Sequence, residues 1–161
     1  MVERVATGIR GFDEVSQGGL PKRKTTLVAG NAGCGKTTLS MHFLVNGARR
    51  FEEPGLFVSF EESPEELREN FSSFGAELER ACDEGAIAFE HVQPGTITQY
   101  EAGEFSLEGL FLRLDQAVRR IGAQRVVLDT IESLFSSFQD QRTVRAEIKR
   151  LFDWLKERGV T

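Results

Sequence analysis

The sequence of 161 residues has little that would tie it to a membrane, to an oxidising compartment or to nucleic acid. Its two cysteines, Cys34 and Cys82, form neither a disulfide framework nor a metal-binding spacing, which favours a reducing cytoplasm. No apolar run approaches membrane-spanning length, and the first residues do not read as a secretion signal. The net charge of −5 provides no global attraction to nucleic acid or to anionic lipid. We therefore expect a cytoplasmic protein with no membrane partner, and we do not expect nucleic acid as a partner.

Short apolar runs alternate with helical patterns along the chain. Hydrophobic residues make up 40% of the sequence and charged residues 28%, which is typical of a globular protein, and the length suits a single domain over residues 1–161. The apolar runs predict strands at 25–30, 55–60, 86–92 and 125–129. The helical patterns cover residues 36–50, 63–74, 77–82 and 107–121, with a last helix that carries Val144 to Leu155 and stops at Gly159. This alternation predicts an α/β fold with a mostly parallel sheet covered by helices on both sides.

A glycine-rich run follows the first predicted strand. Residues 30–37, GNAGCGKT, fit the phosphate-loop pattern G-x-x-x-x-G-K-[ST] at every fixed position, between a predicted strand and a predicted helix. Backbone N–H groups and the helix N-terminus would hold the phosphates of ATP, and Lys36 would reach the β- and γ-phosphates. The residues expected to bind the nucleotide are Gly30, Asn31, Ala32, Gly33, Cys34, Gly35, Lys36, Thr37 and Thr38.

Two oxygen donors are candidates for a magnesium site. The Thr37 hydroxyl closes the phosphate loop, and Asp129 ends the strand RVVLD. ATP-hydrolysing proteins of this kind hold Mg²⁺ with a hydroxyl of the loop and a carboxylate at the end of a later strand. We therefore expect Mg²⁺ at Thr37 and Asp129, with capping of the next segment as the alternative role for Asp129.

Five glutamates compete to orient the water that attacks ATP. Glu132 lies beyond the strand that ends at Asp129, but the residue directly after that strand is a threonine. Glu65 and Glu66 have a structural explanation, because SPEE at 63–66 is a capping box with proline at the first helical position.

Glu61 and Glu62 remain, at the carboxyl end of the second predicted strand, where parallel α/β sheets place their ligands. Since neighbouring strand residues point to opposite faces, we expect one of the pair to aim at the nucleotide. The alternative is a solvated pair of charges.

Four segments carry a family resemblance. TGIRGFDEVSQGGLP, TTLVAGNAGCGKTTLSMHFLVNGA, EPGLFVSFEESPEEL and RVVLDTIESLF resemble the RecA-like ATPase domain of KaiC-family proteins. The resemblance implies a P-loop ATPase that binds ATP between the subunits of a ring, typically a hexamer, with autokinase activity in the cyanobacterial clock protein. It also implies that the paired glutamates, Glu61 and Glu62, are the catalytic carboxylates, with Glu61 as the principal base and Lys36 assisting.

The resemblance covers only part of such a domain. RecA-like domains place the strand after the helix that follows Asp129 in the centre of the sheet, and here that strand would begin at Val160. The basic residues that the family projects into the neighbouring site, and the segment phosphorylated in the clock protein, come later still. We therefore expect a truncated portion of a longer KaiC-like protein, with the later strands missing.

Three functions are open at this point. One is ATP hydrolysis used for clock-like or signalling regulation through protein partners, with a possible autokinase activity. A second is a RecA-like DNA recombinase or helicase motor, which needs basic loops; the predicted loop at 93–105 contains Glu101 and Glu104 but no lysine or arginine. The third is a non-catalytic nucleotide-binding assembly module.

Overall fold

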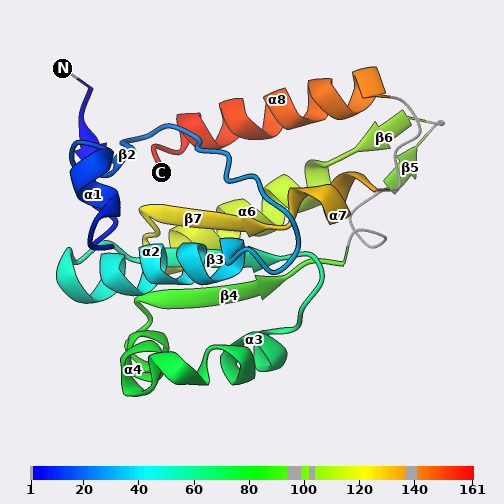
Figure 1. Cartoon of the computed structure of the whole chain (residues 1–161). Coiled ribbons are helices and arrows are strands. Elements are labelled where there is room, and N and C mark those ends of the chain that lie inside the picture. Colours follow the sequence, from blue (N-terminus) through cyan, green and yellow to red (C-terminus); the bar gives the residue numbers. More distant parts are fainter. Residues whose placement is uncertain (1, 94–98, 102–103, 137–140) are drawn as a thin grey trace.

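A three-stranded parallel sheet, in the order β4-β3-β7, forms the centre of the chain (Figure 1). The computed structural model describes residues 2–93, 99–101, 104–136 and 141–161. The strands are β3 (Gly55–Ser59), β4 (Ile87–His91) and β7 (Arg125–Asp129). Their register is even, since Gly55 pairs with the first residue and Ser59 with the last residue of both neighbours. All three carboxyl ends therefore meet at one edge of the sheet.

Helices and two small antiparallel ribbons surround this sheet. Their bounds are β1 (Arg4–Val5), α1 (Phe12–Val15), β2 (Leu20–Pro21), α2 (Lys36–Arg50), α3 (Pro64–Asn70), a 3-10 helix (Ser72–Phe74), α4 (Ala76–Asp83), β5 (Gln99–Glu101), β6 (Glu104–Ser106), α6 (Glu108–Ile121), α7 (Ile131–Phe135) and α8 (Gln141–Glu157). The ribbons are β1 paired with β2 and β5 paired with β6.

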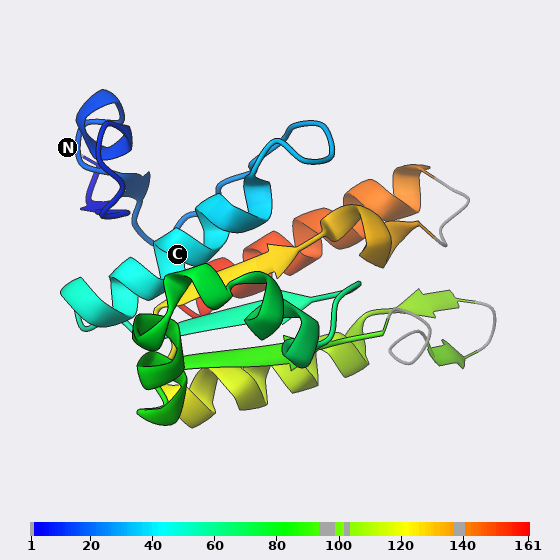
Figure 2. The same cartoon turned by 60° about the horizontal axis from the view of Figure 1, so that its bottom comes forward.

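The side chains of β3 alternate between two hydrophobic clusters, one on each face of the sheet. Leu56 and Val58 pack with apolar residues of α6, α7 and α8. Phe57 packs on the other face with residues of α2, α3 and α4. Figure 2 shows α2 and α6 on opposite sides of the strands. Every residue of β3 is buried, so the prediction of a parallel sheet covered on both sides is confirmed.

Most elements predicted from the sequence are present. Strands form within 55–60 and 86–92, and the strand at 125–129 and the helix at 36–50 have the predicted bounds. The helix predicted over 63–74 is α3 followed by the 3-10 turn, and the last helix ends before Gly159 as expected. The predicted loop at 93–105 contains β5 and most of β6; the remainder of that stretch lies largely outside the described residues.

The predicted strand at 25–30 is wrong. These residues have no regular structure, and the side chains of Leu27 and Val28 are 74% and 42% exposed. A strand needs a hydrogen-bonded neighbour, and within the described residues none lies beside this run. The composition of this run, apolar and rich in β-branched residues, is typical of a buried strand, but in the structure the run is exposed to solvent.

The edge of β7 that faces away from β3 has one pairing partner among the described residues, Thr161. Thr161 donates its backbone N–H to the Gln124 carbonyl, and its own carbonyl accepts from Val126 N–H, both at 2.9 Å. This is the pattern of parallel strand pairing. The Thr161 hydroxyl also accepts from the backbone N–H of Arg23 at 2.9 Å. These contacts place Thr161 between β7 and Arg23, at the position where a strand beginning near Val160 is expected from the sequence, although residues 160 and 161 themselves have no regular structure.

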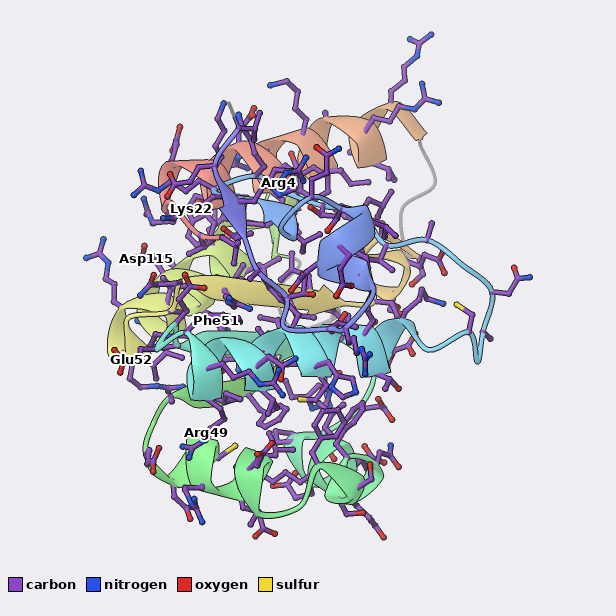
Figure 3. The ribbon with its side chains drawn as sticks, turned by 60° about the vertical axis from the view of Figure 1, so that its left-hand side comes forward. Arg4, Lys22, Arg49, Phe51, Glu52 and Asp115 are labelled. Atoms are coloured by element: carbon purple, nitrogen blue, oxygen red, sulfur yellow. The ribbon has the colours of Figure 1, made fainter. Side chains whose placement is uncertain are left out.

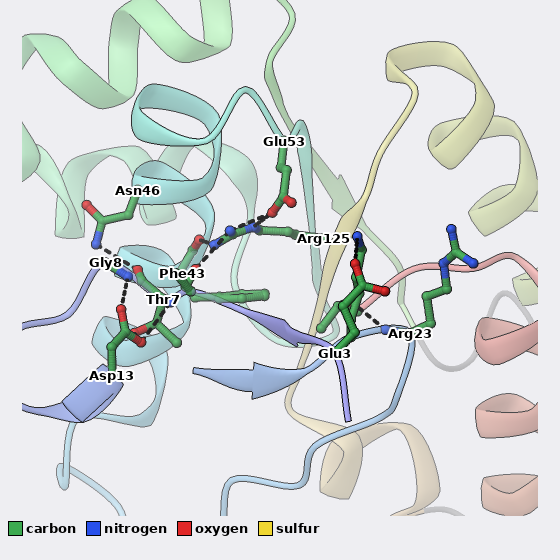
Figure 4. Close-up of polar contacts among 12 residues, drawn as sticks. Glu3, Thr7, Gly8, Asp13, Arg23, Phe43, Asn46, Glu53 and Arg125 are labelled. Carbon is green, nitrogen blue, oxygen red and sulfur yellow. Dashed lines mark hydrogen bonds and ion pairs between the residues drawn. The ribbon is translucent and has the colours of Figure 1, made fainter. Parts of the chain in front are cut away.

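Arg125, the first residue of β7, is a buried cation that joins three parts of the chain. Its guanidinium is 1% exposed and donates to Glu53 Oε2 at 2.7 Å, to the Phe43 carbonyl at 2.8 Å and to the Ala6 carbonyl at 2.9 Å (Figure 4). It also lies 4.5 Å from the centre of the Phe43 ring. Burial lowers the pKa of Arg125, while Glu53 opposes that shift. A Cβ at Gly47 would meet the Arg125 side chain at 2.5 Å, so α2 needs glycine there.

The N-terminal segment is held against α2 by a second polar cluster. Asp13 accepts from the backbone N–H and the hydroxyl of Thr7 and from Gly8 N–H, at 2.7 to 2.9 Å, and Asn46 of α2 donates to the Thr7 carbonyl at 3.0 Å (Figure 4). Partial burial opposes ionisation of Asp13, but the hydrogen bonds from Thr7 and Gly8 outweigh it and lower its pKa. This cluster fixes the segment from Thr7 to Asp13 against α2, the helix that follows the phosphate loop.

Replacing Arg125 by methionine should lower the free energy of unfolding by about 3 kcal/mol, because the Glu53 carboxylate and two carbonyls lose their buried donor. Urea unfolding measures the change. Arg49→Met is the matched control, because Arg49 (labelled in Figure 3) forms an exposed ion pair with Glu84 at 2.9 Å. The control should change stability by less than about 1 kcal/mol. Equal effects of the two substitutions would contradict the role given to Arg125.

Candidate active site

The phosphate loop and the carboxyl ends of β3 and β7 lie toward the same side of the molecule in both views (Figures 1 and 2). The loop leads into the N-terminus of α2, which packs on one face of the sheet through Met41 and Leu44. Asp129 ends β7, and Glu61 and Glu62 follow β3. The fold thus gathers the predicted groups at the sheet edge where parallel α/β proteins bind ligands.

The phosphate loop has the backbone form that its glycines permit. Gly33 and Gly35 have φ angles of 78° and 89°, and no atom lies within 4 Å of a Cβ built on either of them. Glycine is therefore needed there for its backbone angle rather than for space. Residues 31–35 are exposed, and Lys36 Nζ donates to the carbonyls of Gly30 and Asn31 at 2.8 and 3.0 Å.

The N-terminus of α2 is suited to an anion. Its cap residue, Gly35, makes no side-chain hydrogen bond to the helix, and the first turn has no acidic residue. The first N–H groups of the helix and the positive end of its dipole are therefore available to phosphate oxygens. Cys34 Sγ lies 3.9 Å from Lys36 Nζ, and the structure gives the thiol no other hydrogen-bond partner among the described residues.

Glu61 extends toward the β7–α7 connection. Its Oε1 accepts hydrogen bonds from the hydroxyl of Ser133 and from that of Thr130, the latter at 3.4 Å. The two hydroxyls are themselves 3.0 Å apart. Neither residue was identified from the sequence; the only signal was that both are hydroxylated and follow Asp129 within four positions.

Glu62 extends the other way, toward α3. Its Oε1 accepts from Asn70 Nδ2 at 2.8 Å. The buried hydroxyl of Ser59 accepts from the backbone N–H groups of Glu62 at 2.9 Å and of Glu61 at 3.3 Å, and so fixes the turn that separates the two carboxylates. The expectation that neighbouring residues here point to different sides agrees with these contacts.

Glu65 and Glu66 belong to the start of α3, as predicted. Ser63 accepts from Glu66 N–H at 3.3 Å, the Glu66 carboxylate accepts from Ser63 N–H at 2.8 Å, and Pro64 takes the first helical position. The backbone N–H of Ser63, and then its hydroxyl, lower the pKa of Glu66. The capping box is confirmed, and both glutamates lie in the first turn, where negative charge is favourable.

Asp129 and Thr37 offer two oxygen donors from different elements. Both side chains are half-buried, Asp129 at the end of β7 and Thr37 in the first turn of α2. Among the described residues there is no cluster of three or more metal-ligating side chains. This donor set fits Mg²⁺, which takes one or two protein oxygens and completes its octahedron with water and phosphate. Glu132, the remaining candidate base, is exposed in the first turn of α7.

A cavity of about 540 Å³ runs along the outer side of α2 and begins at Thr38, beside the phosphate loop. Its α2 wall also includes His42 and Asn46, and its opposite wall includes Ser73 and Phe74. The rings of His42 and Phe74 lie 4.5 Å apart. The part of the cavity formed by Ser73 and Phe74 was not predicted from the sequence. These residues belong to a 3-10 turn at the end of a predicted helix, and that turn carries no motif of its own.

Comparison with known proteins identifies relatives of the chain. The family model "ATPase: KaiC" matches residues 5–161. The chain is 50% identical over 155 residues to circadian clock protein KaiC2 of Synechocystis sp., covering 96% of this chain and 27% of that protein. It is 44% identical over 160 residues to circadian clock oscillator protein KaiC of Parasynechococcus marenigrum, covering 99% of this chain and 31% of that protein. The chain thus spans about a third or less of the length of the relatives it matches.

A third relative, circadian clock oscillator protein KaiC of Nostoc sp., is 44% identical over 160 residues, which cover 99% of this chain and 31% of the relative.

In the described part of the chain, no helix combines the length and the apolar character needed to cross a bilayer.

Replacing Glu66 by glutamine should make thermal stability less dependent on pH. Because the pKa of Glu66 is lowered in the folded chain, its contribution is complete above the ordinary glutamate value of about 4.3 and is lost as pH falls through the lowered value. The wild-type advantage over Glu66→Gln should therefore be present at neutral pH and vanish in acid. Glu65→Gln is the control, and melting curves across this pH range measure both. A constant difference at all pH values would contradict the assignment.

Proposed function

The chain belongs to the KaiC ATPase family, which has a RecA-like fold, and from this membership and the geometry of the site we propose that it binds and hydrolyses ATP in a Mg²⁺-dependent reaction. The observation that carries the proposal is the meeting of a phosphate loop, a half-buried strand-end aspartate and paired glutamates at one edge of the sheet. Each supplies one requirement of phosphoryl transfer to water.

The phosphates bind at the N-terminus of α2. The β- and γ-phosphates accept from the loop N–H groups between Gly30 and Thr38, and Lys36 exchanges its contacts with the loop carbonyls for phosphate oxygens. Thr37 and Asp129 would hold Mg²⁺, which would supply positive charge opposite the phosphate oxygens. The main role of Lys36 is to stabilise the negative charge of the transition state.

Glu61 acts as the principal base and Glu62 supports it. Glu61 accepts a proton from water as the water oxygen forms its bond to the γ-phosphorus, and the bond from that phosphorus to the bridging oxygen breaks with its electron pair passing to ADP. The hydrogen bond between Asn70 and Glu62 holds the second carboxylate on the α3 side. Cys34 is a bystander in this reaction.

The nucleoside end of ATP occupies the cavity along α2. The lining of the cavity includes Thr38, two residues past Lys36, so a nucleotide whose phosphates lie at the helix N-terminus can continue into it. The rings of His42 and Phe74, which are tilted by 52° to each other, provide an aromatic surface for a base.

The assembly is part of the same proposal. We propose that the protein associates into a ring, a hexamer in its full-length form, with ATP between subunits, a neighbour supplying a cation to the site, and regulatory proteins as partners. The named relatives are circadian clock proteins, which supports a clock-like or signalling role, with autokinase activity in the full-length protein. The two cysteines outside any disulfide pattern and the net charge of −5 are the grounds on which we also propose a cytoplasmic location without membrane or nucleic-acid partners.

The substitution of both Glu61 and Glu62 by glutamine should leave ATP binding intact and abolish hydrolysis, because the amides keep the size of the side chains but cannot accept a proton. Lys36→Ala should weaken ATP binding itself. Calorimetric titration measures ATP binding. Release of inorganic phosphate by the full-length protein measures turnover. Unchanged turnover in the double variant would refute the catalytic assignment, and binding without turnover in the wild type would favour the assembly module.

Replacement of the exposed His42 by alanine should weaken ATP binding by roughly three- to tenfold, as expected for the loss of one aromatic stacking contact. Binding of inorganic tripolyphosphate to the same variant should be unchanged, because it reaches only the phosphate loop. The two titrations are each other's control. Equal losses for both ligands would show that the nucleoside lies elsewhere.

A further inference from the structure

We propose that Ser133 of α7 is a positioning residue for the base Glu61. The proposal rests on the function proposed above and adds a residue to its machinery. Its hydroxyl contacts Glu61 Oε1, and the Thr130 hydroxyl, 3.0 Å from that of Ser133, contacts the same oxygen. The hydroxyl of Thr130, which precedes α7, and that of Ser133, in its first turn, therefore contact the same carboxylate oxygen.

The position of Ser133 is fixed by its neighbours. Its backbone N–H donates to the Thr130 carbonyl at 3.2 Å, which closes the first turn of α7. The next two residues, Leu134 and Phe135, are 0% and 7% exposed, and they belong to the hydrophobic cluster that α7 shares with β3, α6 and α8. Since the helix is anchored by these buried side chains, the half-buried Ser133 hydroxyl is presented to Glu61 at a defined place.

The contacts give the two oxygens of Glu61 different roles. In the described part of the chain, the side-chain hydrogen bonds of Glu61 go to Oε1. Oε2 is thereby left to accept a proton from the attacking water. A hydroxyl that donates to Oε1 also limits rotation of the carboxylate, so Ser133 holds Oε2 at a defined place for the attacking water.

The arrangement also couples the base to the metal ligand. Ser133 lies four residues after Asp129, on the helix that begins directly beyond β7. Glu61 follows β3, which pairs with β7 so that Ser59 lies opposite Asp129. The contact between Ser133 and Glu61 therefore joins the two strand ends on which the Mg²⁺ ligand and the base depend. Glu62, held from α3, has no such contact among the described residues.

The test compares Ser133→Ala with Ser136→Ala in steady-state ATP hydrolysis by the protein as its gene encodes it. Ser136 also has its hydroxyl bonded within α7, to the Ser133 carbonyl at 2.9 Å, but does not contact Glu61. Ser133→Ala should lower kcat by about tenfold and leave KM for ATP unchanged, because the nucleotide still binds while the base is no longer held in place for the chemical step. Ser133→Thr, which keeps the hydroxyl, should restore most of kcat, and Ser136→Ala should behave as wild type.

A wild-type kcat in Ser133→Ala would overturn the inference, as would the same loss of kcat in Ser136→Ala. Glu61→Gln in the same assay distinguishes failure of the proposed function from failure of the role of Ser133. If Glu61→Gln keeps full turnover, Glu61 is not the catalytic base and the proposed function fails. If Glu61→Gln is inactive while Ser133→Ala is normal, only the role of Ser133 fails. Should Ser133→Ala unfold, Ser133→Cys, with nearly the same shape and a weak donor, must show the loss of kcat.

Discussion

The pairing of β3 on both of its edges is the constraint on which the rest of the structure depends. Because β3 pairs in register with β4 and with β7, the three strands end at one level, and the residues that follow them enter one region of space. The same pairing makes β3 the only strand of the described sheet that is buried along its whole length, so its alternating side chains can seed a core on each face. The helices of the site are then placed by packing against these two cores.

Arg125 links that sheet to the N-terminal segment and to α2, the helix that follows the phosphate loop. A lone buried guanidinium would be costly, but here its charge is met by Glu53 and its remaining N–H groups by carbonyls of Phe43 and Ala6. Since these partners lie on the turn before β3, on α2 and on the N-terminal segment, the cation fixes their relative positions. Thr7, next to Ala6, extends this order to Asn46 of α2. The elements that carry the phosphate loop are thus oriented from the amino end of β7, far from the loop itself.

Local signals made most of the fold and the candidate site predictable. The phosphate-loop glycines, the capping box at Ser63, the helical patterns and three of the four apolar runs depend on near neighbours in the chain, and the structure agrees with them. The strand at 25–30 was predicted wrongly because its composition describes a buried environment that no strand pairing in the described residues provides. The hydroxyls that contact Glu61, and the wall at Phe74, depend on contacts distant in sequence, and no single residue type announces such contacts.

The two halves of the candidate site differ in how firmly the chain holds them. Glu61 follows β3 and is held through its side chain by Ser133, while Asp129 ends β7 and is held through its carbonyl by Phe60 N–H. The phosphate loop is anchored by α2, while residues 25–30 before it lie exposed and Lys36 bonds to the carbonyls of its own loop. Pairing between strands therefore fixes the backbone that carries Glu61 and Asp129, whereas among the described residues no strand pairing fixes the backbone that enters the phosphate loop.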